Sequence, residues 1–200
     1  MYVYEKRLQY PVNIKIKNPK IAQVVISQYG GPDGEASAAM RYMSQKFTFK
    51  NPRIAGLLND IATEELSHLE IVGTIVHQLV KDLPCDDADI AGFEKYYVDH
   101  TLGLWPQAAG GVPFQATEFQ SSGDPIADLV EDMAAEQKAR KTYDNILTLV
   151  KDNEVCDPIR FLRKREIVHF QRFGEALRML TEELDKKNYY AFNPSGCKCK

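Results

Sequence analysis

The chain carries the same pattern of four chemically specific residues twice, and this repeat constrains its fold more than any other feature. A glutamate is followed by a tyrosine seven positions later, and a Glu-x-x-His motif begins thirty positions after the glutamate. Each residue of the second copy lies 101 positions after its counterpart in the first. The two copies are Glu35, Tyr42, Glu65 and His68, and Glu136, Tyr143, Glu166 and His169. A constant offset at four such positions predicts two structurally equivalent halves.

The spacing of the repeat is useful on α-helices. A glutamate and a histidine three positions apart lie on the same face of a helix, so Glu65 and His68 can reach one point in a bundle interior. Residues seven apart also return to one face, which places Tyr42 two turns from Glu35 on the same stripe. We expect the tyrosine hydroxyls to hydrogen-bond to ligand carboxylates or to metal-bound water.

Four glutamates that converge in a helical core require positive charge. The carboxylates would repel one another, and burial of even one ionised group costs several kcal/mol. Two divalent ions would balance four carboxylates, and a site of oxygens with one imidazole per metal suits manganese or iron. Helix bundles build such dinuclear sites from two single glutamates and two Glu-x-x-His motifs. One Glu-x-x-His is more often a solvated pair, but two matched ones predict a dinuclear metal site.

Asx-Pro pairs divide the chain into helices. An Asn or Asp caps a helix start, and a proline fits the first helical position without losing a hydrogen bond. The pairs are Asn18-Pro19, Asn51-Pro52, Asp124-Pro125 and Asp157-Pro158. A short apolar segment at 21–26 precedes four predicted helices at 33–49, 52–81, 125–151 and 158–185. The long connection at 83–123 then joins two helical hairpins, which is the ferritin-like arrangement of an all-α four-helix bundle.

The domain prediction follows from these boundaries. We expect an N-terminal arm at 1–18, a bundle at 19–186 with its crossover at 83–123, and a tail at 187–200 that contains tyrosines and cysteines. Two hundred residues are enough for one core with a buried polar site. The cysteines form no Cys-x-x-Cys pair, which excludes a rubredoxin-like site. Cys197 and Cys199 are either an exposed chain end or a crosslinking and metal-capturing site.

Composition and charge exclude several classes of function. The chain is 44% hydrophobic and 26% charged, as globular proteins are, and its net charge of −3 gives no basic surface for nucleic acid. No run approaches the ~20 apolar residues of a membrane span, and residues 1–11 lack the apolar stretch of a signal peptide. We therefore predict no nucleic-acid partner, no membrane insertion and no secretion by a signal peptide.

The residues around both motifs resemble the manganese catalases, and in particular their short spore-coat relatives of the CotJC type. The resemblance covers about residues 15–180. The matching stretches are Gly30-Gly31-Pro32-Asp33-Gly34-Glu35, Thr63-Glu64-Glu65-Leu66-Ser67-His68-Leu69-Glu70, Gly123-Asp124-Pro125 with Asp128-Leu129, and Arg165-Glu166-Ile167-Val168-His169.

This resemblance implies two manganese ions per chain and the disproportionation of hydrogen peroxide to water and dioxygen. It also implies a homo-oligomer, a hexamer, that resides in the cytoplasm or the spore coat. Glu166 would lie near the open coordination position, where it moves protons, and Tyr42 would lie close by. Ala135 stands where active members of the family carry an arginine. The ligands that the resemblance implies are Glu35, Glu65, His68, Glu136 and His169.

Two other functions remain open from the sequence. One is a di-iron ferroxidase or a rubrerythrin-like peroxidase, although the latter normally needs the absent Cys-x-x-Cys pairs. The other is a structural spore-coat protein with a vestigial metal site, bound to other coat proteins and crosslinked through tyrosines such as Tyr189 and Tyr190. The presence of both Tyr42 and Glu166 favours catalysis.

Overall fold

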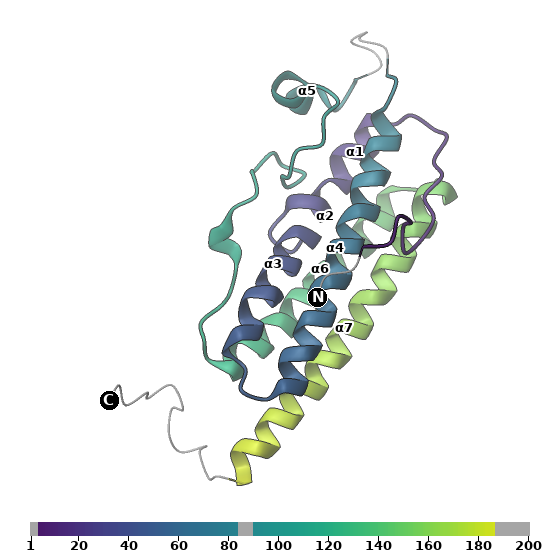
Figure 1. The fold of residues 1–200 in the computed structure, drawn as a ribbon. Helices are drawn as coiled ribbons and strands as arrows, with labels where there is room; N and C mark the ends of the chain where they lie inside the picture. The colour runs from purple at the N-terminus through teal and green to yellow at the C-terminus, as the bar shows by residue number, and fades with distance from the viewer. Residues whose placement is uncertain (1–3, 84–89, 187–200) are drawn as a thin grey trace.

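A computed structural model describes residues 4–83 and 90–186 (Figure 1). Within these ranges the regular elements are all helices, and the β-structure is limited to one isolated bridge between Gln107 and Pro113. The all-α, ferritin-like prediction is confirmed. No helix in the described ranges combines the length and the apolar character that crossing a membrane requires.

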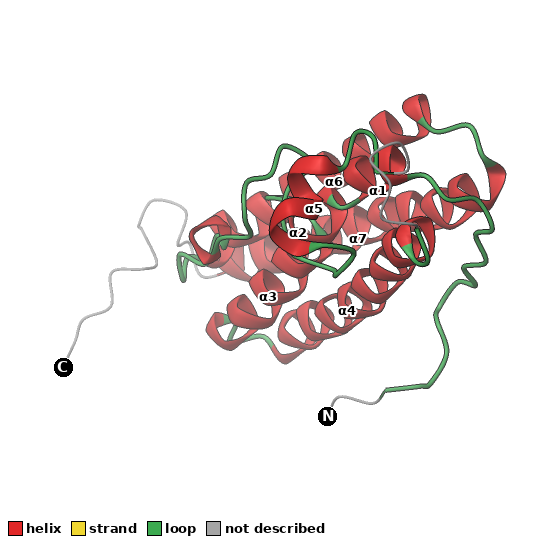
Figure 2. Ribbon diagram, turned by 90° about the horizontal axis from the view of Figure 1, so that it is seen from above, coloured by secondary structure: helices red, strands yellow, loops and turns green. Residues whose placement is uncertain are grey.

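Four helices form the bundle as two hairpins (Figures 1 and 2). The first hairpin pairs α3 (Glu35–Gln45) with α4 (Pro52–Val80). The second pairs α6 (Pro125–Leu149) with α7 (Asn153–Lys186). Helix α3 is shorter than the predicted range of 33–49, because a 3₁₀ turn, η1 (Lys46–Thr48), follows it.

Two short helices precede α3 and lie in line with it beside α4 (Figure 1). They are α1 (Pro19–Val25) and α2 (Ser27–Gly30). The chain enters α1 from an extended N-terminal arm, which begins the described structure at residue 4. One of the four helix positions of the bundle is therefore filled by three consecutive helices, and α3 is the one that lies next to the bundle centre.

Three of the four predicted helix starts are confirmed by their cap geometry. The side chain of Asn18 accepts a hydrogen bond from the backbone N–H of Ile21. Asn51 and Asp124 cap α4 and α6 in the same way, and in all three helices proline occupies the first turn. The proline costs no hydrogen bond there because first-turn N–H groups have no partner within the helix.

The fourth predicted start, Asp157-Pro158, is wrong. Helix α7 begins five residues earlier, where the side chain of Asp152 accepts a hydrogen bond of 2.8 Å from Glu154 N–H. Pro158 lies within the helix and removes one backbone hydrogen bond, to the carbonyl of Glu154. Asp157 instead pairs with Arg160 at 2.7 Å. Asp152, five residues before Asp157, therefore caps the start of the helix.

The crossover between α4 and α6 runs along the outside of α3 (Figure 1). It contains α5 (Glu94–His100) and the 3₁₀ turn η2 (Ala116–Glu118). Gly30 permits this packing, because a Cβ atom there would lie 2.4 Å from backbone atoms of Pro106 and Gln107. Gln45 on α3 donates a hydrogen bond to the carbonyl of Gln120 at 2.5 Å. The crossover therefore covers one side of the bundle.

The domain boundaries at 18 and 186 stay predictions. The tail at 187–200, with Cys197 and Cys199, lies outside the described residues, as do residues 1–3 and Cys85. Cys156 is a free, buried cysteine.

Two apolar clusters fill the ends of the bundle and leave a polar layer between them. The first cluster includes Ile71 and Ile75 of α4 with Leu162 of α7. The second includes Leu58 of α4 and Phe173 of α7. On each of these helices the Glu-x-x-His motif lies between the two clusters. The layer that contains the motifs is thus closed at both ends by apolar side chains.

Candidate metal centre

Six carboxylate and imidazole side chains from four helices meet in the polar layer, and each is no more than 2% exposed. Helix α3 contributes one glutamate at its first position, and α6 contributes another in its middle. Helices α4 and α7 each contribute a Glu-x-x-His motif. The six residues are Glu35, Glu65, His68, Glu136, Glu166 and His169.

Glu65 lies between the two histidines. Its Oε2 is 2.7 Å from Nδ1 of His68, and its Oε1 is 2.7 Å from Nδ1 of His169. Glu35 Oε2 is 3.8 Å from Nδ1 of His68, and Glu136 Oε2 is 3.5 Å from Nδ1 of His169. The arrangement therefore consists of two matched groups, each with one histidine and one glutamate, that share Glu65.

Glu166 lies as close to the centre as the other groups. One ligand atom from each of Glu65, His68, Glu166 and His169 lies within 4.8 Å of the other three, so these four buried residues could hold a metal ion. The family resemblance implies a role in proton transfer for Glu166, and in the structure Glu166 lies within reach of the same point as the histidines.

Each tyrosine of the repeat hydrogen-bonds to the glutamate of the opposite half. Tyr42 Oη donates to Glu136 Oε1 at 2.5 Å, and Tyr143 Oη donates to Glu35 Oε1. Both phenols are almost fully buried, and the Tyr42 ring packs against Phe173 with ring centroids 4.8 Å apart. The tyrosines therefore join the two halves of the bundle across the centre.

Glu64, which the sequence analysis did not single out, contacts the outer nitrogens of both histidines. Its Oε2 is 3.1 Å from Nε2 of His169, and its Oε1 is 3.6 Å from Nε2 of His68. Arg165 donates to the same carboxylate at 2.6 and 3.1 Å. A carboxylate in this position favours the Nε2–H form of both rings and leaves Nδ1 as the ligand atom. One signal was present, since Glu64 and Arg165 have opposite charges and lie 101 positions apart.

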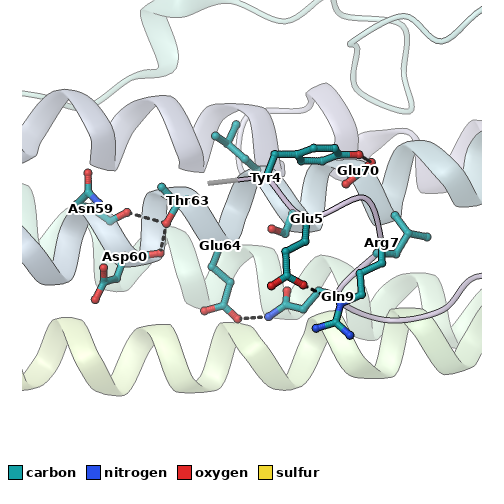
Figure 3. Close-up of a pocket in the computed structure, with 12 residues that line it drawn as sticks. Tyr4, Glu5, Arg7, Gln9, Asn59, Asp60, Thr63, Glu64 and Glu70 are labelled. Carbon is teal, nitrogen blue, oxygen red and sulfur yellow. Dashed lines mark hydrogen bonds and ion pairs between the residues drawn. The ribbon is translucent and has the colours of Figure 1, made fainter. Parts of the chain in front are cut away.

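The N-terminal arm covers the outer side of Glu64 (Figure 3). Gln9 donates a hydrogen bond of 2.9 Å to Glu64 Oε1, beside a surface cavity of about 760 Å³ between the arm and α4. Tyr10 stacks on Phe161 with ring centroids 4.9 Å apart, and Phe161 contacts His68 edge-on. The arm therefore contacts both groups that support His68.

Burial and neighbouring charges shift the pKa values of the glutamates in the centre in opposite directions. Burial, assisted by Glu65, raises the pKa of Glu35 to about 8. Burial also raises the pKa of Glu166 well above its ordinary value, with Glu136 and Glu35 adding to the effect. Burial would raise the pKa of Glu65 too, but His169 and His68 outweigh it and hold that pKa below its usual range. The pKa of each histidine is raised by Glu65 despite burial.

The donor set fits a pair of divalent cations. Among the described residues, Oε2 of Glu136 and Oε1 of Glu166 are buried without a hydrogen-bond partner, and Glu65 Oε1 and His169 Nδ1, although 2.7 Å apart, do not hydrogen-bond to each other. Buried polar atoms are nearly always paired, so these atoms require protons or cations that face them. Carboxylate oxygens with one imidazole per metal are ligands that manganese and iron accept.

Two helical hairpins that bury a carboxylate and histidine centre define a ferritin-like, dimetal-binding class of protein. Comparison with known families is more specific, because the family described as manganese containing catalase matches residues 1–192. The chain belongs to the manganese catalase family.

Individual relatives refine this assignment. The chain is 50% identical over 190 residues to protein CotJC of Bacillus subtilis, which covers 95% of this chain and 100% of that one. It is 34% identical to a probable manganese catalase of Clostridium acetobutylicum, over 94% of this chain and 85% of the relative. The crystal structure of the manganese catalase KatB from Anabaena matches with a TM-score of 0.84 and 34% identity, over 90% of this chain and 81% of that one. Within the family, the chain belongs to the CotJC-like branch.

Proposed function

We propose that the protein is a manganese catalase that disproportionates two molecules of hydrogen peroxide into two of water and one of dioxygen. The observation that carries this proposal is the position of Glu65, whose two oxygens each face Nδ1 of one histidine while Glu166 lies beside them. This arrangement suits two ions that share one carboxylate, next to a further carboxyl group. Membership of the manganese catalase family supports the same activity.

Five residues would hold two manganese ions in this proposal. The manganese ions would supply a reversible two-electron couple and would act as Lewis acids toward bound peroxide. Glu65 lies between the two histidines, while Tyr143 and Tyr42 orient Glu35 and Glu136 by donating to one oxygen of each. Glu64 orients both imidazoles through their outer nitrogens. The proposed ligands are Glu35, Glu65, His68, Glu136 and His169.

Glu166 is the proposed proton carrier. Reduction of one peroxide to two waters consumes two protons and two electrons, and oxidation of the next to dioxygen returns both. A carboxyl group whose pKa is raised by burial can hold a proton near neutral pH and release it again. Its Oε1 has no hydrogen-bond partner among the described residues, so it is available to a substrate.

The test combines metal analysis with oxygen evolution. Protein produced in manganese-supplemented medium is expected to contain two manganese ions per chain and to release dioxygen on addition of peroxide. The same protein loaded with iron serves as the comparison for the ferroxidase alternative. Two manganese ions with negligible oxygen release would refute the catalase proposal.

A structural role is the second candidate, because the centre lies between two apolar clusters and ties four helices together. In that case manganese would raise the melting temperature without oxygen release. We propose the cytoplasm or the spore coat as the location and a homo-oligomer as the active form. The hexamer implied by the family resemblance is checked by light scattering of the manganese-loaded protein.

A further inference from the structure

The two histidines of the centre differ in how their outer nitrogens are held. Nε2 of His169 hydrogen-bonds to Glu64 Oε2 at 3.1 Å. Nε2 of His68 lies 3.6 Å from Glu64 Oε1, and among the described residues it has no hydrogen-bond partner. Both side chains are fully buried, so water from the bulk does not remove this difference. The orientation of the His68 ring therefore depends more on its other neighbours than that of His169 does.

The N-terminal arm reaches His68 through an aromatic pair. Tyr10 of the arm stacks on Phe161 of α7, with ring centroids 4.9 Å apart and an angle of 26° between the ring planes. Phe161 meets the His68 ring edge-on, with ring centroids 6.3 Å apart. Within the described ranges Phe161 makes no such ring contact with His169. The aromatic pair therefore connects the arm with one histidine of the two.

The neighbouring arm residue, Gln9, acts on the part of Glu64 that faces His68. Its Nε2 donates a hydrogen bond of 2.9 Å to Glu64 Oε1, the oxygen nearer to His68 (Figure 3). Arg165 donates to the same oxygen at 2.6 Å and to Oε2 at 3.1 Å. The position of Oε1 is thus set by the arm and α7 together, whereas Oε2, which holds His169, is fixed from α7.

The arm is attached to α4 on both sides of Gln9 and Tyr10. Nearer the N-terminus, an arm tyrosine donates a hydrogen bond of 2.8 Å to Glu70 Oε1. Further along the arm, the backbone N–H of Ile14 donates to Gln78 Oε1 at 2.7 Å, and Gln78 Nε2 donates back to an arm carbonyl at 3.1 Å. These contacts hold the arm to the helix that carries His68.

We propose that the N-terminal arm makes the two metal positions unequal, with Gln9 and Tyr10 as positioning residues for the ion that His68 holds. The inference rests on the proposed function for the presence of two manganese ions. A side chain that is already held in its binding orientation loses less conformational freedom when it binds, so supporting contacts raise metal affinity. Because the arm supports His68 and not His169, the ion on His169 should bind almost independently of the arm.

The experiment titrates the metal-free, full-length protein with Mn²⁺ and resolves two binding constants by calorimetry. In Tyr10→Ala we expect one ion to bind about tenfold more weakly, at the low end of the range for residues that support metal ligands. The other ion should bind as in the parent protein. Electron paramagnetic resonance at Mn²⁺ concentrations between the two constants should then show isolated ions and no coupled pair. Gln9→Leu, which removes the hydrogen-bond donor, should cause a smaller change in the same direction.

Two variants separate positioning from a general effect on the arm. Tyr10→Phe keeps the ring that stacks on Phe161 and should bind both ions as the parent protein does. Tyr4→Phe removes the hydrogen bond between the same arm and Glu70. It leaves the contacts of Gln9 and Tyr10 in place, so both binding constants should stay unchanged.

The His68→Ala background identifies which ion is weakened. Addition of Tyr10→Ala to this variant should not change the binding of the remaining ion, which His169 holds. A loss in this background as large as that in the parent protein overturns the inference. Unchanged constants in Tyr10→Ala, or an equal loss of both ions, overturn it as well, and they decide alone if His68→Ala binds no ion. Absence of oxygen release together with the expected unequal binding would refute the catalase proposal alone.

Discussion

Glu65 and Glu166 occupy equivalent positions in the two halves of the chain, yet the structure gives them opposite properties. Glu65 has a histidine nitrogen 2.7 Å from each of its oxygens, and the histidines hold its pKa below the usual range. Glu166 faces Glu136, Glu35 and Glu65, and burial together with these carboxyl groups raises its pKa. A repeated sequence pattern therefore fixes where a residue lies, while the charges of its neighbours set the direction in which its pKa shifts.

The repeat is also broken at the positions directly before these two glutamates. Position 64 is a glutamate, and the equivalent position 165 is an arginine that pairs with it at 2.6 Å. Glu64 contacts both histidines, so both imidazoles are supported from the side of α4. An asymmetric pair of supporting residues thus accompanies the asymmetric roles of the two glutamates.

The largest expected effect comes from Glu65→Gln. It removes the carboxylate between both histidines and leaves the remaining buried charges uncompensated, which costs about 3–5 kcal/mol when a buried pair is broken. We expect loss of most bound manganese together with a lower melting temperature. Metal analysis and thermal unfolding check this. Two metals per chain at the parent melting temperature would show that Glu65 is not a ligand.

The equivalent change in the other half, Glu166→Gln, sharpens the comparison. Because Glu166 is proposed to move protons and not to be required as a ligand, manganese should stay bound. Oxygen release should fall by about a hundredfold or more, as loss of a general acid–base group does. The measurement is peroxide turnover normalised to bound manganese. Full turnover would remove Glu166 from the mechanism, and loss of metal would make it a ligand.

Glu64→Gln tests the residue that breaks the repeat. The amide keeps the size of the side chain but weakens the contacts to both histidines and to Arg165. We expect manganese affinity to fall by about 10- to 100-fold, the range found when residues that support metal ligands are replaced. Competition with a chelator measures this. Glu70→Gln, on the same helix and paired with Tyr4 at the surface, is the control and should leave affinity unchanged.

The smallest expected effect is the pH dependence of the free energy of unfolding of the metal-free protein. Glu35, with a folded pKa of about 8, and Glu166 bind protons more tightly when folded than when unfolded. The raised pKa values of His68 and His169 act in the same direction. Stability should therefore fall as pH rises from about 5 to 8. The lowered pKa of Glu65 adds a nearly constant contribution to the free energy of unfolding across this pH range.

Denaturant unfolding of chelator-treated protein at several pH values measures this trend. Manganese should reverse it, because the metal displaces protons and binds more tightly as pH rises. If the stability of the metal-free protein increased over the same pH range, the pKa values of these groups would not be raised in the folded state.

The fold and the residues that meet in its centre were largely accessible from sequence, for physical reasons. Asn and Asp before proline specify helix starts locally, although Asp152 shows that a neighbouring cap can take precedence over Asp157. The repeat brought the six central residues to notice because helix spacing alone places them on inward faces. The pairing of Tyr42 with Glu136 was not accessible, since it depends on how one helix is shifted along another. The contacts of Glu64 depend on the same shift between α4 and α7.

The crossed tyrosine pairs bear on how such a molecule can arise. Each half of the chain supplies the phenol that the other half's glutamate requires, so two copies of one helical hairpin, associated as a dimer, would contain both pairs. The Glu64–Arg165 pair is different, because identical hairpins would place like residues at both positions. Two halves of one chain can differ in charge at these positions, whereas two identical hairpins cannot. The single chain can therefore hold an unequal centre that a symmetric dimer of one hairpin could not.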